Sequence, residues 1–150
     1  MKRILLLPVL MLLPAVLFAG GFFQPVPMAE VARLMNTPGV AILDVNVQEV
    51  WEKHHIPGAV HIDSPDIAKF LPPDKGATLI FYCAGPLCES SGIAADESVM
   101  LGYRQVYVMR DGIFGWVKAG YPVEASPPAM NRAPAATHDQ GDNSHGDHHM

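Results

Sequence analysis

Cysteine is scarce in this sequence, because only two of the 150 residues are cysteine. A framework of disulfide bonds therefore does not organise the fold, although two thiols can still pair in an oxidising compartment. Basic residues are also few: 10 lysines and arginines stand against 15 aspartates and glutamates, which gives a net charge of −5. This balance lacks the basic surface of a nucleic-acid-binding protein, so we expect no nucleic-acid partner. No internal repeat is visible.

The first 21 residues have the pattern of a secretory signal peptide. Lys2 and Arg3 precede an almost purely apolar run, 4–18, and small residues occupy 19–21. The alternative is an uncleaved membrane anchor, because the apolar run continues past residue 21 towards the roughly 20 residues that span a bilayer. We expect the remaining chain in the bacterial periplasm or secreted or, with a retained anchor, on the inner membrane facing the periplasm.

Strand and helix patterns alternate between residues 28 and 123. Three expected helices cover 28–35, 67–70 and 113–118. Another is expected to begin at the cap residue Asn46 and to run through Trp51. A further helix is expected from Ser90 or Ser91 to its stop at Gly102. The expected strands cover 40–45, 59–62, 78–82 and 106–109. This alternation predicts an α/β domain at residues 22–124 with a largely parallel sheet. The helix before Gly102 is expected to use these apolar residues for packing: Ile93, Ala94, Val99 and Leu101.

From residue 125 to residue 150 the composition changes to a segment that cannot bury a core. Prolines at 127, 128 and 134 predict an extended linker, and the low-complexity remainder is expected to be disordered. Four histidines lie there among aspartates: His138, His145, His148 and His149. Imidazole and carboxylate groups bind borderline metal ions, so this tail is a candidate site for Zn²⁺, Cu²⁺ or Ni²⁺. The alternative is adventitious metal binding without a biological role.

Cys83 is the first candidate for a reactive group, because it directly follows the most strand-like run, 78–82. Parallel sheets place reactive groups at the carboxyl ends of their strands. The constrained turn 84–87 favours backbone N–H groups that point at an anion, and the next helix N-terminus adds partial positive charge. Both effects predict a lowered pKa for the Cys83 thiol. The alternative is that Cys83 packs as a small apolar residue.

Three groups of motifs follow one another along the chain with regular spacing. The first contains Asp44-Val45, Glu49, Trp51 and His55-Ile56-Pro57-Gly58-Ala59. The second contains Phe81-Tyr82-Cys83, Ser90-Ser91, Ala94-Ala95, Leu101-Gly102-Tyr103 and Val106-Tyr107-Val108. The third contains Asp111-Gly112, Trp116, Ala119-Gly120 and Pro122-Val123. Together, from about Met28 to Val123, these motifs resemble the rhodanese-like domain family.

This resemblance implies a rhodanese-like α/β fold, with helices on both faces of a mostly parallel sheet, and a sulfurtransferase that requires no cofactor. In the family, a loop cysteine takes the outer sulfur of a donor such as thiosulfate, holds it as a persulfide and passes it to a nucleophile. By position, Cys83 is that cysteine. The implied cradle of the persulfide is the loop Ala84, Gly85, Pro86, Leu87, Cys88, Glu89 and Ser90. The implied partners are a small-molecule sulfur donor and a thiol or protein acceptor, with membrane contact only if the leader is retained.

The loop departs from the simple family pattern in its charge. No lysine or arginine lies between Cys83 and Ser91, and Glu89 adds a carboxylate. Because this carboxylate repels a doubly charged anion, we expect weak activity with thiosulfate and a neutral or organic persulfide, or a polysulfide, as the donor. Asn46 stands where the family commonly has an arginine, so a structural ion pair is expected to be missing.

Cys88 is a second thiol, five residues after Cys83. If the two Cα atoms lie within about 7 Å, Cys88 is able to resolve a Cys83 persulfide, release sulfide and leave a disulfide. The alternative is that Cys88 fills space under the loop. Three functions therefore stay open: a sulfurtransferase or sulfane-sulfur carrier, a thiol–disulfide redox protein, and a non-catalytic binding or metal-delivery module that works through its His-rich tail.

Other residues near the expected site have simpler roles. His54, His55 and His61 are close in sequence, but we expect structural contacts rather than metal ligation. Asp44 and Arg110 follow strand patterns and are candidates for the rim of the site. A turn-stabilising hydrogen bond is the expected role of Asp44, and a solvated loop position is the expected one for Arg110. Two aromatic residues are expected in the core or in packing between helix and sheet: Trp51 and Trp116.

Overall fold

The computed structural model describes residues 22–126, a range that contains the whole expected α/β domain. The expected signal peptide at 1–21 lies outside the described residues, and so do the histidines of the tail, His138, His145, His148 and His149. Within residues 22–126, no helix combines the length and the apolar character needed to cross a membrane.

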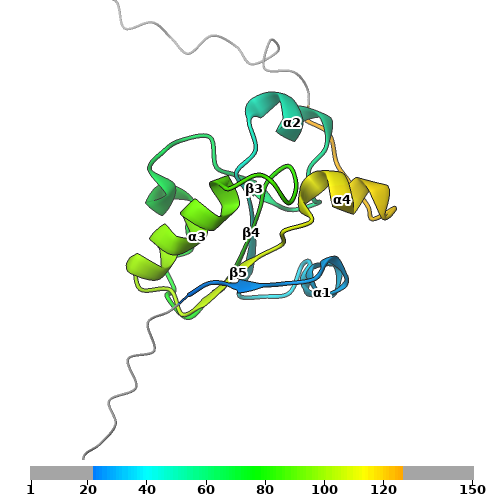
Figure 1. Ribbon diagram of the computed structural model, residues 1–150. Coiled ribbons are helices and arrows are strands. Elements are labelled where there is room, and N and C mark those ends of the chain that lie inside the picture. Colours follow the sequence, from blue (N-terminus) through cyan, green and yellow to red (C-terminus); the bar gives the residue numbers. More distant parts are fainter. Residues whose placement is uncertain (1–21, 127–150) are drawn as a thin grey trace, which may run out of the picture.

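The domain is built on a sheet of five parallel strands (Figure 1). The strands are β1 (Gln24–Pro25), β2 (Val40–Asp44), β3 (Val60–His61), β4 (Thr78–Tyr82) and β5 (Gln105–Val108). Their spatial order is β1-β5-β4-β2-β3, so β4 lies in the centre and pairs with β2 and β5. The carboxyl end of β4 therefore opens at the middle of one sheet edge, where parallel sheets hold their functional groups.

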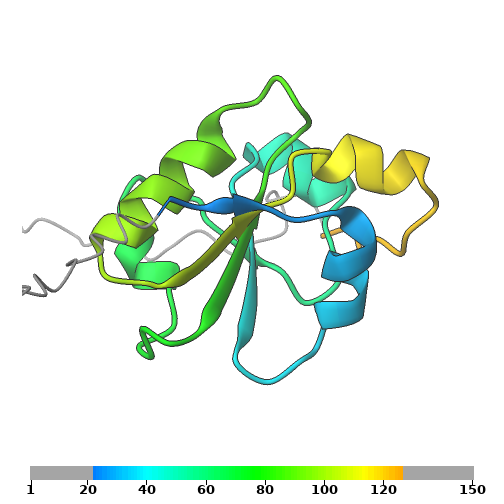
Figure 2. The same ribbon diagram turned by 60° about the horizontal axis from the view of Figure 1, so that its bottom comes forward.

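Helices cover both faces of this sheet. They are α1 (Met28–Leu34), α2 (Gln48–Lys53), the 3₁₀ helix η1 (Ile67–Phe70), α3 (Ser90–Met100) and α4 (Gly112–Lys118). Figure 2 shows α3 on one side of the strands and α1 and α4 on the other. Ile67 of η1 joins the core on the α3 side, whereas Val50 of α2 packs on the α1 and α4 side. The predicted fold class is confirmed.

Two cores form because alternate side chains of β4 point to opposite faces of the sheet. Leu79 and Phe81 pack on the α3 side, whereas Ile80 and Tyr82 pack on the α1 and α4 side. All four side chains are fully buried, and the Tyr82 hydroxyl oxygen accepts the backbone N–H of Ile56 at 3.1 Å. A strand buried on both faces has a continuous apolar sequence, which explains why the pattern at 78–82 predicts β4 with its correct bounds.

The starts and faces of two helices differ from the predictions. Asn46 does not cap α2, because its backbone N–H donates to Oδ1 of Asp44 at 2.7 Å and the helix begins at Gln48. In α3, Ile93 is 65% exposed and Leu101 is 39% exposed, so their predicted place in the core is wrong. The buried face of α3 consists of small residues: Ser91, Ala94, Ala95 and Ser98. Ala94 is therefore predicted correctly, whereas Ser91, Ala95 and Ser98 are missed because a search for large apolar side chains does not find such small residues.

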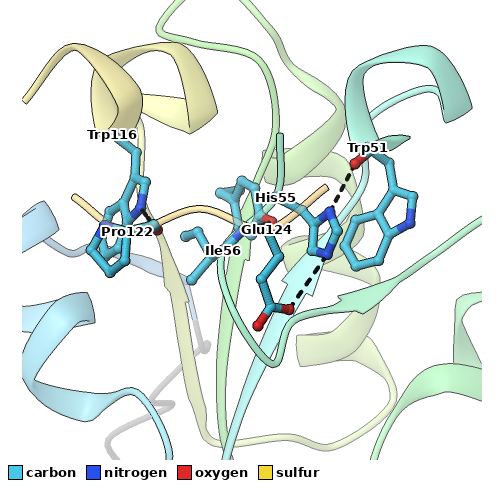
Figure 3. A network of polar contacts seen from close by, with 7 residues as sticks. Trp51, His55, Ile56, Trp116, Pro122 and Glu124 are labelled. Carbon is cyan, nitrogen blue, oxygen red and sulfur yellow. Dashed lines mark hydrogen bonds and ion pairs between the residues drawn. The ribbon is translucent and has the colours of Figure 1, made fainter. Parts of the chain in front are cut away.

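The chain crosses back to α2 after the last helix. His55 and Glu124 exchange two backbone hydrogen bonds of 2.9 Å each, and their side chains lie 3.8 Å apart between Nε2 and Oε2 (Figure 3). The backbone N–H of Ser126 then donates to the carbonyl oxygen of Glu52 at 3.0 Å. Regular contacts therefore extend two residues past the predicted domain boundary at residue 124. We call residues 121–126 the closing segment.

Trp116 anchors the start of the closing segment. Its indole N–H donates to the carbonyl oxygen of Pro122 at 2.8 Å (Figure 3), and its ring stacks on Tyr121 with centroids 4.4 Å apart. Trp116 is fully buried, so its predicted place in the core is confirmed. Its single polar group is satisfied by the segment that covers it, as a buried indole requires.

Candidate functional site

Cys83 lies directly after β4, as predicted, and only 2% of its surface is exposed. Its thiol donates to the carbonyl oxygen of Cys88, with a distance of 3.3 Å from Sγ, and Sγ also lies 3.3 Å from Oγ of Ser91. Ser91 belongs to the first turn of α3 and is itself buried. The thiol is therefore held between residues 84–89, which we call the cysteine loop, and the start of α3.

The cysteine loop is also fastened to the N-terminus of α4. The backbone N–H of Ile113 donates to the carbonyl oxygen of Cys83 at 2.8 Å, and that of Phe114 donates to Ala84 at 3.1 Å. This approach depends on Gly112, where φ is +64° and a Cβ atom would lie 2.4 Å from the carbonyl carbon of Ala84. Glycine tolerates both the backbone conformation and the close contact. Helices on both sides thus fix the loop.

The pKa of Cys83 differs in direction from the sequence-based expectation. Burial raises the pKa of this thiol, and its interaction with the Cys88 thiol raises it further, whereas hydrogen bonds from Ser91 lower it. The net effect is an increase, so the predicted decrease is wrong. The physical reason is desolvation, because a thiolate loses more than a thiol when packed helices exclude water from it.

The pKa of Cys88 moves in the opposite direction. Burial works to raise it, but hydrogen bonds from the Cys83 thiol, from the backbone N–H of Ala84 and from Ser90 together lower it. The sequence predicts a loop whose N–H groups stabilise an anion, and such N–H groups are present, but they donate to the sulfur of Cys88. Of the two thiols, Cys88 is the one that ionises more readily in this structure.

A pocket of about 250 Å³ opens beside the cysteine loop. Cys88 lines it together with three charged residues, Glu89, Asp96 and Arg110, and Cys83 is not among its lining residues. Arg110 therefore lies at the pocket, as the rim hypothesis expects, with its guanidinium 5.7 Å from the centre of the Phe23 ring. Asp96 is absent from the predicted site, although its position two helical turns after Glu89 is a signal that both share one helix face.

Comparison with known proteins decides the family. A family model described as the rhodanese-like domain matches residues 27–119. The chain belongs to the rhodanese-like domain family. Thiosulfate sulfurtransferase GlpE of Pseudomonas fluorescens is 32% identical to it over 105 residues, which cover 69% of this chain and 93% of that protein.

Two further relatives extend the comparison for this rhodanese-like domain. An HTH-type transcriptional regulator of Mycobacterium tuberculosis is 30% identical over 113 residues, which cover 73% of this chain and 48% of the regulator. The chain thus spans about half the length of that protein. The solved rhodanese-like domain of an Anabaena protein has a TM-score of 0.58 at 24% identity and covers 85% of this chain and 96% of that domain. The structural similarity shows the fold, and the family membership supports a sulfurtransferase-like kind of protein.

Asp44 does not lie at the pocket of the rhodanese-like domain. It is fully buried at the end of β2, so its predicted place on the rim is wrong. Its Oδ1 atom instead accepts the backbone N–H of Asn46, which confirms the predicted turn-stabilising hydrogen bond. Burial raises the pKa of Asp44, and this outweighs the hydrogen bonds that lower it. The carboxyl is a structural group behind the site.

Two histidines of the rhodanese-like domain have structural contacts. Nδ1 of His55 lies 2.8 Å from the carbonyl oxygen of Trp51, and Nε2 of His61 lies 2.8 Å from that of Asn46. The Trp51 ring stacks on both imidazoles, with centroid distances of 3.7 and 4.7 Å, and stays half-buried rather than entering the core. Among residues 22–126 there is no group of three His, Cys, Asp or Glu side chains placed to hold a metal ion.

Proposed function

We propose that this domain is an exported sulfurtransferase or sulfane-sulfur carrier that stores sulfur as a persulfide on Cys83. The observation that carries the proposal is the position of Cys83 at the carboxyl end of the central strand, in a loop held by α3 and α4. The relative named thiosulfate sulfurtransferase supports the same chemistry. Export to the periplasm or beyond rests on the signal-like leader, with a membrane-anchored form as the alternative.

The proposed reaction is a transfer of one sulfur atom in two displacements. Cys83 sulfur attacks the outer sulfur of a donor R–S–SH, the donor's S–S bond breaks, and R–SH leaves. The acceptor, a small thiol or a protein thiol, then attacks the outer sulfur of the Cys83 persulfide and restores the free cysteine. The hydroxyl of Ser91, 3.3 Å from Sγ, stabilises the anion that forms in each step.

The charges at the pocket favour a donor other than thiosulfate. Glu89 and Asp96 contribute two carboxylates and Arg110 contributes one guanidinium, so the lining carries a net negative charge. At a separation of about 4 Å, two unit charges near a protein surface interact by about 4 kcal/mol, so a dianion is disfavoured there. A neutral or organic persulfide, or a singly charged polysulfide, brings less negative charge and suits the pocket better. Arg110 supplies one contact for a carboxylate on such a donor.

Mass spectrometry of the reduced full-length chain tests the proposal. After incubation with an inorganic polysulfide, we expect a gain of about 32 Da, one sulfur atom, on the peptide that contains Cys83. Fragmentation of that peptide assigns the added sulfur to position 83, and the control variant Cys83→Ser should show no adduct at that position. Absence of any adduct on either cysteine contradicts the proposal, and if metal binding is retained it favours a non-catalytic binding or metal-delivery module. Turnover of thiosulfate as fast as its curated relatives contradicts the proposed donor class.

A thiol–disulfide redox function is the second candidate, favoured by the direct interaction of the two thiols. A mild oxidant such as diamide should then remove both free thiols from the wild-type chain as one intramolecular disulfide. The variant Cys88→Ser, treated in the same way, should keep its remaining thiol. Two free thiols in the oxidised wild type exclude this candidate.

A further inference from the structure

The pocket beside the cysteine loop meets Cys88 and not the deeper cysteine. A second hollow, of about 440 Å³, lies between the loop and Phe114 of α4, and Cys88 lines this one too, again without Cys83. Cys83 is buried to 2% exposure, whereas Cys88 is half-buried. A donor that enters either hollow therefore meets the Cys88 side of the loop first.

The two cysteines are in contact, so sulfur has only a short way to travel between them. The thiol of Cys83 donates to the carbonyl oxygen of Cys88 at 3.3 Å, and the two side chains interact directly. On its other side, the Cys83 sulfur lies 3.3 Å from Oγ of Ser91 in α3.

We propose that Cys88 is a second catalytic thiol, which takes the sulfur from the donor at the pocket and passes it to Cys83. This inference rests on the proposed function, because it assigns the route by which Cys83 becomes loaded. It differs from the resolving role, in which Cys88 would expel sulfide from the Cys83 persulfide and leave a disulfide. In the relay, the sulfane sulfur keeps its oxidation state and no disulfide forms.

The relay consists of two displacements that balance without an oxidant or reductant. First, the Cys88 thiolate attacks the outer sulfur of the donor R–S–SH; its S–S bond breaks, the outer proton passes to the leaving thiolate, and Cys88–S–S⁻ and R–SH result. Second, the Cys83 sulfur attacks the outer sulfur of that persulfide, whose bond to Cys88 breaks. The Cys83 proton passes to the Cys88 sulfur, so that Cys83–S–S⁻ and Cys88–SH result.

The pKa values of the two thiols are shifted in opposite directions, and this difference suits the two steps. A thiol that ionises readily is the better nucleophile at neutral pH towards an incoming donor, because more of it is thiolate. The same thiol is also the better leaving group in the second step. Burial of Cys83 then shields the stored persulfide from water and from oxidants, while Cys88 keeps contact with the pocket.

A time course with the reduced full-length chain tests the relay. The wild type and the variants Cys83→Ser and Cys88→Ser are mixed with glutathione persulfide, quenched by alkylation and mapped by peptide mass spectrometry. We expect Cys83→Ser to hold the added sulfur on Cys88. We expect Cys88→Ser to load Cys83 several-fold more slowly than the wild type, because the donor then has to reach the buried thiol without the help of the thiol that lines the pocket. Cys88→Ala should show the same slowing, and thermal unfolding verifies that each variant is folded.

Three outcomes overturn the relay. Loading of Cys83 at the wild-type rate in Cys88→Ser and Cys88→Ala shows that the donor reaches Cys83 directly, and it leaves the proposed function standing. Release of sulfide with a Cys83–Cys88 disulfide in the wild type shows resolution instead of relay. Absence of added sulfur on both cysteines of the wild type contradicts the proposed function as well, so the two failures are distinguishable.

Discussion

At the scale of single residues, Cys83 and Cys88 differ in chemistry because they differ in depth. Cys83 is buried beside Ser91 of α3, so desolvation dominates its pKa, whereas the backbone N–H groups of Ala84 and Ser90 reach Cys88. The position of Cys83 is predictable, because the strand before it has a strong apolar pattern. The direction of its pKa is not, because the exclusion of water depends on how two helices pack, and no local pattern encodes that.

Alkylation as a function of pH tests this difference. Between about pH 6 and 9, iodoacetamide should modify Cys88 in the native chain with a pH midpoint below that of a cysteine in the urea-unfolded chain, because its pKa is lowered. In Cys83→Ala the midpoint should rise, because a hydrogen bond from the Cys83 thiol contributes to the lowering and alanine has no donor to replace it. Peptide mapping measures both values, and a native Cys88 midpoint at or above that of the unfolded chain contradicts the assignment.

Asp44 gives a prediction about stability and pH. Its native pKa is raised by burial, so its contribution to the free energy of unfolding is fully present below its unfolded pKa of about 3.9 and is lost as the pH rises through the native pKa. Asp44→Asn keeps an acceptor for the backbone N–H of Asn46 and removes the titration.

Urea unfolding of both proteins from about pH 4 to pH 7 measures this contribution. The wild type should lose stability relative to Asp44→Asn as the pH rises across this window. A constant difference between the two proteins contradicts the prediction, because the substitution would then change only pH-independent contacts.

At the scale of elements, the junction between α4 and the cysteine loop positions the candidate site. The first turn of α4 donates two backbone hydrogen bonds to the residues that follow β4, and Gly112 makes that contact sterically feasible. The motif Asp111-Gly112 is visible in the sequence, but its role is not. Only the fold brings residue 112 into contact with a loop almost thirty positions earlier, so the sequence shows the glycine but not the contact that requires it.

Gly112→Ala should therefore damage stability and the site together. The positive φ and the overlap with the loop backbone should lower the free energy of unfolding by about 3 kcal/mol or more. Gly120→Ala is the matched control, because its φ is also positive, at +79°, but no atom lies within 4 Å of the added Cβ. Gly120→Ala should lower the free energy of unfolding by about 1 kcal/mol. Equal losses in the two variants, measured by chemical denaturation, would show that backbone conformation alone matters.

The helices show where pattern reasoning succeeds and fails. η1 and β4 have the bounds that their patterns predict, because each is a short, mostly apolar segment between clear breaks. The orientation of α3 is not predictable in this way, because its buried face is made of serine and alanine while Ile93 is exposed. Steric fit against the sheet, rather than hydrophobicity, decides which side of this helix faces inward.

At the scale of the whole molecule, the closing segment joins the end of the fold to α2. Its backbone hydrogen bonds to His55 and Glu52 connect residues about seventy positions apart, on the side of the sheet that carries α1 and α4. The sequence shows a change of composition near residue 125, and the contacts of the closing segment continue to Ser126. The contact of Ser126 is not predictable from the sequence, because almost any residue type can donate a backbone hydrogen bond.

Truncation at two points tests the contribution of the closing segment. A chain that ends after Val123 loses the hydrogen bonds of Glu124 and Ser126, and its free energy of unfolding should fall by about 2–3 kcal/mol. A chain that ends after Ser126 keeps these bonds and is the control. Urea unfolding of both measures the difference, and indistinguishable midpoints would show that the segment adds nothing to stability.

The pairing of β1 has a consequence for the order of events during synthesis. β1 begins the described chain, yet its two residues pair only with Tyr107 and Val108 of β5, close to the end of the domain. A chain emerging from the ribosome therefore cannot complete its sheet until more than eighty further residues have followed the first strand. Val26 and Val31, which are buried in the finished core, stay exposed during that interval. Folding of this domain is accordingly completed only after nearly all of it has been synthesised. Until then the chain stays unfolded in part and is accessible to factors that bind unfolded polypeptides.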